Sequence, residues 1–142
     1  MLNLRTIGLF ALALAVIGLV GTGGASSKIE WHTYEAGMAR SKFENKKVFL
    51  HFTAEWCGYC REMDRKTFQD ATVVASLNRD FIPIRVDYDR EPATSALYKV
   101  KGLPDSWFLS ENGTVIGHRP GYITPEQFLS ILKVVAGGGL GK

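Results

Sequence analysis

The sequence predicts a single α/β domain with a central mixed β-sheet and helices on both faces, preceded by an N-terminal signal or anchor segment. Three observations predict it. The length of 142 residues suits one domain. Apolar strand-like runs alternate with helical patterns early in the chain, and a hairpin followed by a capped helix closes it. The composition, 46% hydrophobic and 22% charged, is typical of a globular protein rather than a disordered one.

Residues 1–25 have the order of a secretory signal and precede the predicted domain, which spans residues 26–142. Arg5 gives a positive start, residues 7–20 form an apolar run, and Gly23 and Ala25 are a small-residue pair before a cleavage site. The run is shorter than the roughly 20 apolar residues that span a bilayer comfortably, which favours a signal. An uncleaved anchor fits the same residues. We therefore expect a periplasmic or otherwise exported protein, released or anchored by this segment.

Four strands are expected in the domain, and they cover residues 48–53, 81–86, 106–109 and 114–118. The first is apolar on both faces apart from His51, as in a strand covered by helices on both sides. Pro83 in the second lacks a ladder donor, which indicates an edge strand or a bulge. Asn112-Gly113 between the third and fourth is a strong hairpin signal.

Five helices are expected, and they cover residues 33–43, 57–68, 70–78, 92–98 and 124–135. The last is the most strongly specified. Thr124 caps it, Pro125 takes the first helical position, and Gln127 completes a capping box. Because helices alternate with strands early and a hairpin comes late, the sheet is predicted to be part parallel and part antiparallel.

The two cysteines of the chain, Cys57 and Cys60, lie three positions apart where the first strand gives way to a helix. The loop that they can close is too short to stabilise the fold much, so their placement favours chemistry. Unpaired N–H groups and the helix dipole favour a thiolate at a helix N-terminus. Cys60, one turn later on the same face, can attack a mixed disulfide formed by Cys57. The motif predicts thiol–disulfide exchange.

Other uses of the cysteine pair stay open from the residues alone. Half a zinc site and an inert disulfide have the same spacing, but zinc needs four ligands, and the further candidates are His32, His51 and His118. A thiol metallochaperone for a soft ion such as Cu(I) is the alternative function, with Met63 in the same predicted helix. An adaptor that binds peptides without turnover is a third, against which two intact cysteines argue. No resident metal or cofactor is expected, and a net charge of +3 does not suggest a nucleic-acid partner.

Two segments carry a resemblance to the thioredoxin superfamily. Residues 54–60, Ala-Glu-Trp-Cys-Gly-Tyr-Cys, resemble its active-site segment, and residues 100–104, Val-Lys-Gly-Leu-Pro, resemble its cis-proline loop. The resemblance covers about residues 29–135 and implies the thioredoxin fold. The branch that the chain resembles holds exported single-domain thioredoxins and the periplasmic electron-receiving domain of transmembrane disulfide reductases. Protein thiols or disulfides in the exported compartment, and a membrane redox partner, are the partners that it implies.

The resemblance also implies roles for individual residues. Cys57 is the expected nucleophile and Cys60 the resolving thiol. Pro104, preceded by Leu103, is the expected cis residue, beside which substrate backbone pairs as a strand. His51 stands where the family has a buried acid. We expect it to lie buried behind the cysteines, where it helps to move the proton of Cys60 or simply fills core space.

The aromatic and acidic neighbours of the motif complete the candidate site. Trp56 and Tyr59 are candidates for a flat substrate platform beside the sulfur, with ordinary partial burial as the other interpretation of Tyr59. Trp31 and Trp107 are assigned to packing. Asp105 departs from the family pattern, and a negative charge there would disfavour the nearby thiolate. The direction of electron flow is left open.

Overall fold

The computed structural model describes residues 24 and 26–138, which contain four strands and five helices. The strands are β1 (Lys47–Thr53), β2 (Phe81–Asp87), β3 (Asp105–Leu109) and β4 (Val115–Pro120). The helices are α1 (Tyr34–Glu44), α2 (Gly58–Lys66), α3 (Ala71–Asp80), α4 (Pro92–Leu97) and α5 (Pro125–Ala136). The signal or anchor segment predicted over residues 1–25 lies, apart from residue 24, outside the described residues.

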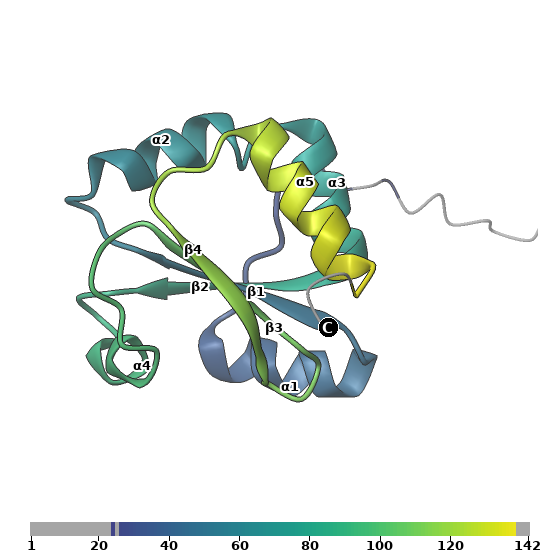
Figure 1. The fold of residues 1–142 in the computed structure, drawn as a ribbon, viewed down its shortest axis with the longest axis horizontal. Helices are drawn as coiled ribbons and strands as arrows, with labels where there is room; N and C mark the ends of the chain where they lie inside the picture. Colours follow the sequence, from purple (N-terminus) through teal and green to yellow (C-terminus); the bar gives the residue numbers. More distant parts are fainter. Residues whose placement is uncertain (1–23, 25, 139–142) are drawn as a thin grey trace, which may run out of the picture.

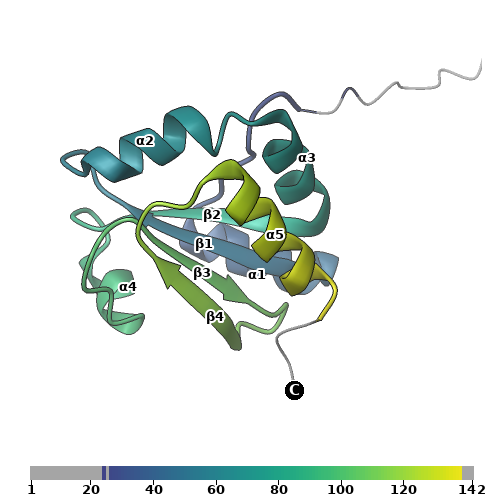
Figure 2. The same ribbon diagram turned by 45° about the horizontal axis from the view of Figure 1, so that its top comes forward.

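The sheet is mixed, as predicted, with the strand order β2-β1-β3-β4. β1 pairs in parallel with β2 and antiparallel with β3, and β3 pairs antiparallel with β4. Helices α2, α3 and α5 cover one face of the sheet, and α1 and α4 cover the other (Figures 1 and 2). Since β1 is an inner strand covered on both faces, its residues from Val48 to Phe52 are all buried.

Alternation along β1 divides the core into two layers. Phe49 and His51 face α2, α3 and α5, where the Phe49 and Phe128 rings meet edge to face with centroids 5.0 Å apart. Val48, Leu50 and Phe52 face the other layer, beneath α1 and α4. The site-bearing helix α2 therefore rests on the same layer as His51.

The predicted cap of the last helix and the predicted turn are confirmed. Thr124 caps α5 in a complete capping box with Gln127. Asp70 also caps α3 through its side chain, a cap beyond the predicted one. Gly113 has φ +86° in the β3–β4 turn, a conformation that glycine adopts without strain. Helix α2 ends at Lys66 rather than at residue 68, because the amides of Thr67 and Phe68 both bond to the Met63 carbonyl, which breaks the regular helical ladder. The Thr67 hydroxyl donates a 2.6 Å hydrogen bond to the buried carbonyl of Ile123.

β2 is the edge strand that Pro83 predicts. Its outer side holds one bridge to the N-terminal segment: the His32 amide donates to the Pro83 carbonyl at 2.9 Å, and the Arg85 amide donates to the His32 carbonyl at 3.1 Å. The amide that proline lacks would point the same way as its carbonyl, away from β1, so the β1–β2 ladder loses no donor. Within the described part of the chain, each helix is too short or too polar to cross a lipid bilayer.

Candidate active site

Cys57 and Cys60 lie at the junction of β1 and α2, joined as a disulfide with their Cα atoms 5.2 Å apart. Cys57 is the N-cap residue of α2, and its Sγ accepts a hydrogen bond from the Cys60 amide at 3.2 Å. Cys57 is 5% exposed and Cys60 1%. The predicted placement at a helix N-terminus is thus confirmed, with Cys57 as the outer and Cys60 as the inner sulfur.

The loop before β3 faces this disulfide. Leu103 and Tyr88 pack against the cluster formed by Ala54 and the two cysteines. The Leu103–Pro104 peptide bond is cis, as the resemblance predicts, and the buried Pro104 carbonyl accepts a hydrogen bond from the Gly121 amide at 2.7 Å. Residues more than forty positions apart in the sequence are therefore in contact around the sulfurs.

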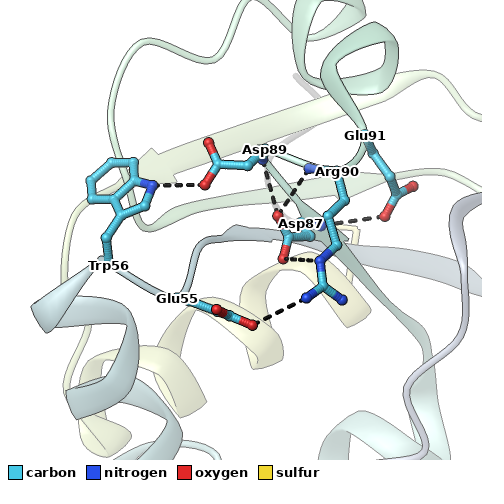
Figure 3. A network of polar contacts seen from close by, with 6 residues as sticks. All are labelled: Glu55, Trp56, Asp87, Asp89, Arg90 and Glu91. Carbon is cyan, nitrogen blue, oxygen red and sulfur yellow. Dashed lines mark hydrogen bonds and ion pairs between the residues drawn. The ribbon is translucent and has the colours of Figure 1, made fainter.

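Trp56 and Tyr59 flank the disulfide on the surface, each 65% exposed. Tyr59 is thus more exposed than covered. The Trp56 indole Nε1 donates a 2.8 Å hydrogen bond to Asp89 Oδ2, so one edge of the ring is anchored while much of it stays open to solvent (Figure 3). Both side chains are placed where a docked polypeptide could contact them.

Residues of the segment between β2 and α4 contact Glu55 and Trp56, the two residues that precede Cys57 (Figure 3). Asp87 Oδ1 accepts hydrogen bonds from the amides of Asp89 and Arg90 at 3.0 and 3.1 Å, which shapes the turn. The Arg90 guanidinium then reaches Glu55 Oε1 at 3.2 Å and Asp87 Oδ2 at 3.8 Å. These exposed pairs contribute little stability. Their effect is to hold the turn against Glu55 and Trp56.

His51 is fully buried in the layer beneath α2, as predicted. Its Nδ1 lies 3.3 Å from Ser106 Oγ, and its ring meets the Phe68 ring edge to face at 4.9 Å. Burial, together with the nearby positive charge of Arg85, lowers the pKa of His51 to about 3, so the ring is neutral. The hydrogen bond of the ring runs to Ser106 and not to a cysteine.

Asp105 is buried at the start of β3, and its carboxylate has a partner. Oδ1 lies 3.1 Å from Nδ1 of His118, whose ring stacks on Trp107 at 4.2 Å. Trp107 packs into the layer beneath α1 and α4, and strand alternation places Asp105 on that same face, opposite to Ser106. The carboxylate that the sequence places next to Pro104 thus has His118 as its hydrogen-bond partner, and it lies on the face of the sheet opposite to Ser106.

The three histidines do not converge on the cysteines. His32 Nδ1 lies 3.2 Å from the Pro83 carbonyl, and His51 and His118 bond to Ser106 and Asp105 respectively. Within residues 24 and 26–138, no group of three or more His, Cys, Asp or Glu side chains is placed to hold a metal ion.

Sequence reasoning missed the contribution of the segment after β2. Asp89 and Arg90 reach the active-site loop from this segment, which lies some thirty positions further along the chain. A signal was present, because the carboxyl ends of neighbouring parallel strands meet at one edge of a sheet, and residues 87–91 follow such a strand.

Comparisons with known proteins agree with this geometry. A family model for a thioredoxin-like domain matches residues 34–136. The chain is 34% identical over 96 residues to the thiol:disulfide interchange protein DsbD of Haemophilus ducreyi, a match that covers 63% of this chain and 17% of DsbD. It is 30% identical over 89 residues to a thioredoxin of Mycoplasmoides gallisepticum, which covers 63% of this chain and 84% of that protein.

Among solved structures, a thioredoxin from Thermus thermophilus superposes with a TM-score of 0.72 at 25% identity, covering 79% of this chain and 90% of that one. A DsbH oxidoreductase superposes with a TM-score of 0.68 at 21% identity, covering 80% and 88%. The chain spans less than a fifth of the length of the first curated relatives that it matches.

Proposed function

The chain belongs to the family of thioredoxin-like domains, disulfide oxidoreductases with the thioredoxin fold, and we propose that it exchanges disulfides with exported proteins through Cys57 and Cys60. The observation that carries the proposal is the position of Cys57. It caps α2, it is paired with Cys60 one turn later, and it packs against the loop that holds Leu103 and Pro104.

In the reducing direction the Cys57 thiolate attacks one sulfur of a substrate disulfide. The substrate S–S bond breaks, its leaving thiolate takes up a proton, and a mixed disulfide joins Cys57 to the substrate. The Cys60 thiolate then attacks Cys57 Sγ, which releases the second substrate thiolate and forms the Cys57–Cys60 disulfide. Two electrons have passed from the dithiol to the substrate, and the same steps in reverse oxidise a substrate dithiol.

The assignment of roles follows from the helix. The N-cap sulfur of Cys57 accepts the Cys60 amide hydrogen bond and lies at the positive end of the α2 dipole, both of which stabilise a thiolate. Cys60 is more deeply buried and suits an attack from within the protein. Trp56 and Tyr59 supply the exposed surface beside Cys57 on which a substrate polypeptide docks, and the backbone next to Pro104 pairs with it.

Trapping experiments test this proposal. The Cys60→Ser variant should accumulate a mixed disulfide through Cys57, because the resolving thiol is missing. The Cys57→Ser variant should trap little, and the wild-type protein is the control for turnover. Equal trapping by the two variants would overturn the role assignment, and an absence of exchange by the wild-type protein would overturn the function.

His51 is proposed to accept the Cys60 proton transiently during resolution, directly or through one water. Its neutral ring can accept a proton, but a pKa of about 3 makes it a weak base, so the transfer from the thiol is uphill and the proton must pass on at once. A single-turnover measurement on His51→Gln decides it. A folded variant that resolves its mixed disulfide at the wild-type rate across neutral pH would show that His51 only fills the core.

The exported location and a membrane redox partner are proposed on the signal-like order of residues 1–25 and on the similarity to DsbD. The mass of the protein recovered from outside the cytoplasm tests the location. A chain that begins near Ser26 supports release, and an intact Met1 in the membrane fraction supports the anchored form. Cytoplasmic recovery of the uncleaved chain would overturn the location.

A further inference from the structure

An ion pair between Arg85 and Asp64 joins the sheet to the active-site helix. The guanidinium of Arg85, on β2, uses both of its terminal nitrogens on the Asp64 carboxylate, with Nη1 3.4 Å from Oδ2 and Nη2 on Oδ1. The same guanidinium lies 4.3 Å above the Trp31 ring and 5.9 Å from that of Phe68. A bidentate bond and an aromatic stack together fix the position of the charge.

The pair lies one helical turn from the inner sulfur. Asp64 follows Cys60 by four positions on α2, so the two side chains share a face of the helix with Cβ atoms about 6 Å apart. Arg85 is the register partner of His51, and strand neighbours in register lie side by side on the same face of the sheet. Asp64 and Arg85 thus place two opposite charges on the side of α2 that Cys60 shares, about one helical turn from its sulfur.

We propose that Arg85 is a positioning residue of the exchange centre, which cancels the charge of Asp64 so that the buried Cys60 can ionise and attack. The inference rests on the proposed thiol–disulfide exchange and names the electrostatic partner of its second step. A bare carboxylate one turn away would disfavour the Cys60 thiolate. With Arg85 bound to it, the two charges act on the sulfur with opposite signs and largely offset one another.

Burial explains why the pair affects the thiol more than the fold. The Arg85 and Asp64 side chains are about one-third exposed, and ion pairs of that exposure contribute little stability. Cys60 is 1% exposed, and a charge acts more strongly on a group that is shielded from water. Removing one member of the pair should therefore shift the pKa of the Cys60 thiol measurably while it changes the melting temperature little.

The pKa of the Cys60 thiol, measured in a Cys57→Ser background by the rate of alkylation against pH, tests the proposal. This readout needs no substrate, so it stands even if the proposed exchange activity fails. Arg85→Gln should raise the thiol pKa by roughly half to one unit, a three- to tenfold loss of thiolate. Asp64→Asn should lower it by a similar amount, and the double variant should return near the parent value. Arg85→Lys, which keeps the positive charge, should leave the thiol pKa close to the parent value.

The other ionisable or charged groups around Cys60 are the same in each variant, so differences between variants report the ion pair. Tyr88 packs against the cysteines, and the elements that meet at the motif carry His51 on β1, Glu55 before the motif, Arg61 on α2 and Asp105 at the start of β3.

Glu62→Gln is the matched control, because Glu62 also forms an ion pair on α2, with Lys66, but lies two positions from Cys60 and does not share its face. It should leave the thiol pKa unchanged. The proposal would be overturned if Arg85→Gln and Asp64→Asn shifted the thiol pKa in the same direction. It would also be overturned if neither shifted the thiol pKa more than Glu62→Gln does. Should Arg85→Gln fail to fold, Asp64→Asn and Arg85→Lys decide the sign by themselves.

Discussion

A neutral histidine in the core makes the stability of this protein depend on pH in a predictable way. His51 has a pKa of about 3 in the folded protein because burial and the charge of Arg85 disfavour its charged form. In the unfolded chain its pKa is about 6.5. The unfolded state therefore binds the proton first, and the free energy of unfolding should fall as the pH drops from about 6.5 towards 3.

The size of this effect follows from the two pKa values. At pH 4.5 the unfolded imidazole is almost fully protonated and the folded one almost fully neutral. The difference of about two pH units, at 1.36 kcal/mol each, amounts to about 2.7 kcal/mol of stability lost relative to neutral pH. A folded-state pKa one unit higher changes this figure by only about 0.1 kcal/mol, because pH 4.5 would still lie above it.

Urea unfolding of the wild-type protein and of His51→Gln, each at pH 7.5 and 4.5, measures the effect. Glutamine can still bond to Ser106 but does not titrate, so the variant should lose about 2.7 kcal/mol less than the wild type between the two pH values. Carboxylates titrate in both proteins and cancel. His32→Gln replaces a half-buried histidine. It controls for the effect of replacing a histidine that is not fully buried. Equal losses in the wild type and His51→Gln would refute the inference that His51 is buried and neutral.

Three further substitutions have expected outcomes. Gly37→Ala should destabilise the fold by about 1–3 kcal/mol in urea unfolding despite the better helix propensity of alanine, because the new Cβ would lie 2.3 Å from Ile84 Cγ1. Thr67→Val should cost about 1–3 kcal/mol by the same measurement, since a buried carbonyl loses its donor. Asp89→Ala frees the Trp56 indole and should raise KM for a protein disulfide a few-fold with kcat unchanged, as measured by steady-state kinetics; an effect confined to kcat would contradict a docking role.

Local signals were sufficient for most of the elements. The end of α5 nearest Thr124 was predictable because a cap, a proline and a capping-box glutamine act within four residues of one another. The buried character of β1 was readable because an inner strand is apolar on both faces. The position of Cys57 followed from the same logic, since a strand pattern ends and a helical pattern begins around it. Features that depend on residues close together in the sequence can therefore be predicted from short segments.

The polar contacts around the cysteines were not predictable in this way. Each joins residues from different elements, and, apart from the β3–β4 hairpin, the pairing depends on the strand order β2-β1-β3-β4, which no local pattern specifies. The four contacts are His51 with Ser106, Trp56 with Asp89, Asp64 with Arg85, and Asp105 with His118. They span between 13 and 55 positions of sequence. Only the resemblance, which supplied the fold, pointed to one of these residues, His51, as buried.

The acidic residues near the motif show why formal charges read from a sequence mislead about a thiol. Asp105 follows Pro104 in the sequence, but strand alternation places it on the face of the sheet opposite to Ser106, where His118 Nδ1 lies 3.1 Å from its carboxylate. Asp64, one turn from Cys60, has Arg85 as its partner. The fields of Asp64 and Arg85 partly cancel at the sulfur, and the acid matters most when Arg85 is lost. The direction in which a substitution shifts the thiol pKa therefore depends on which member of the ion pair is removed. The sequence does not show this, because it does not reveal which two residues form the pair.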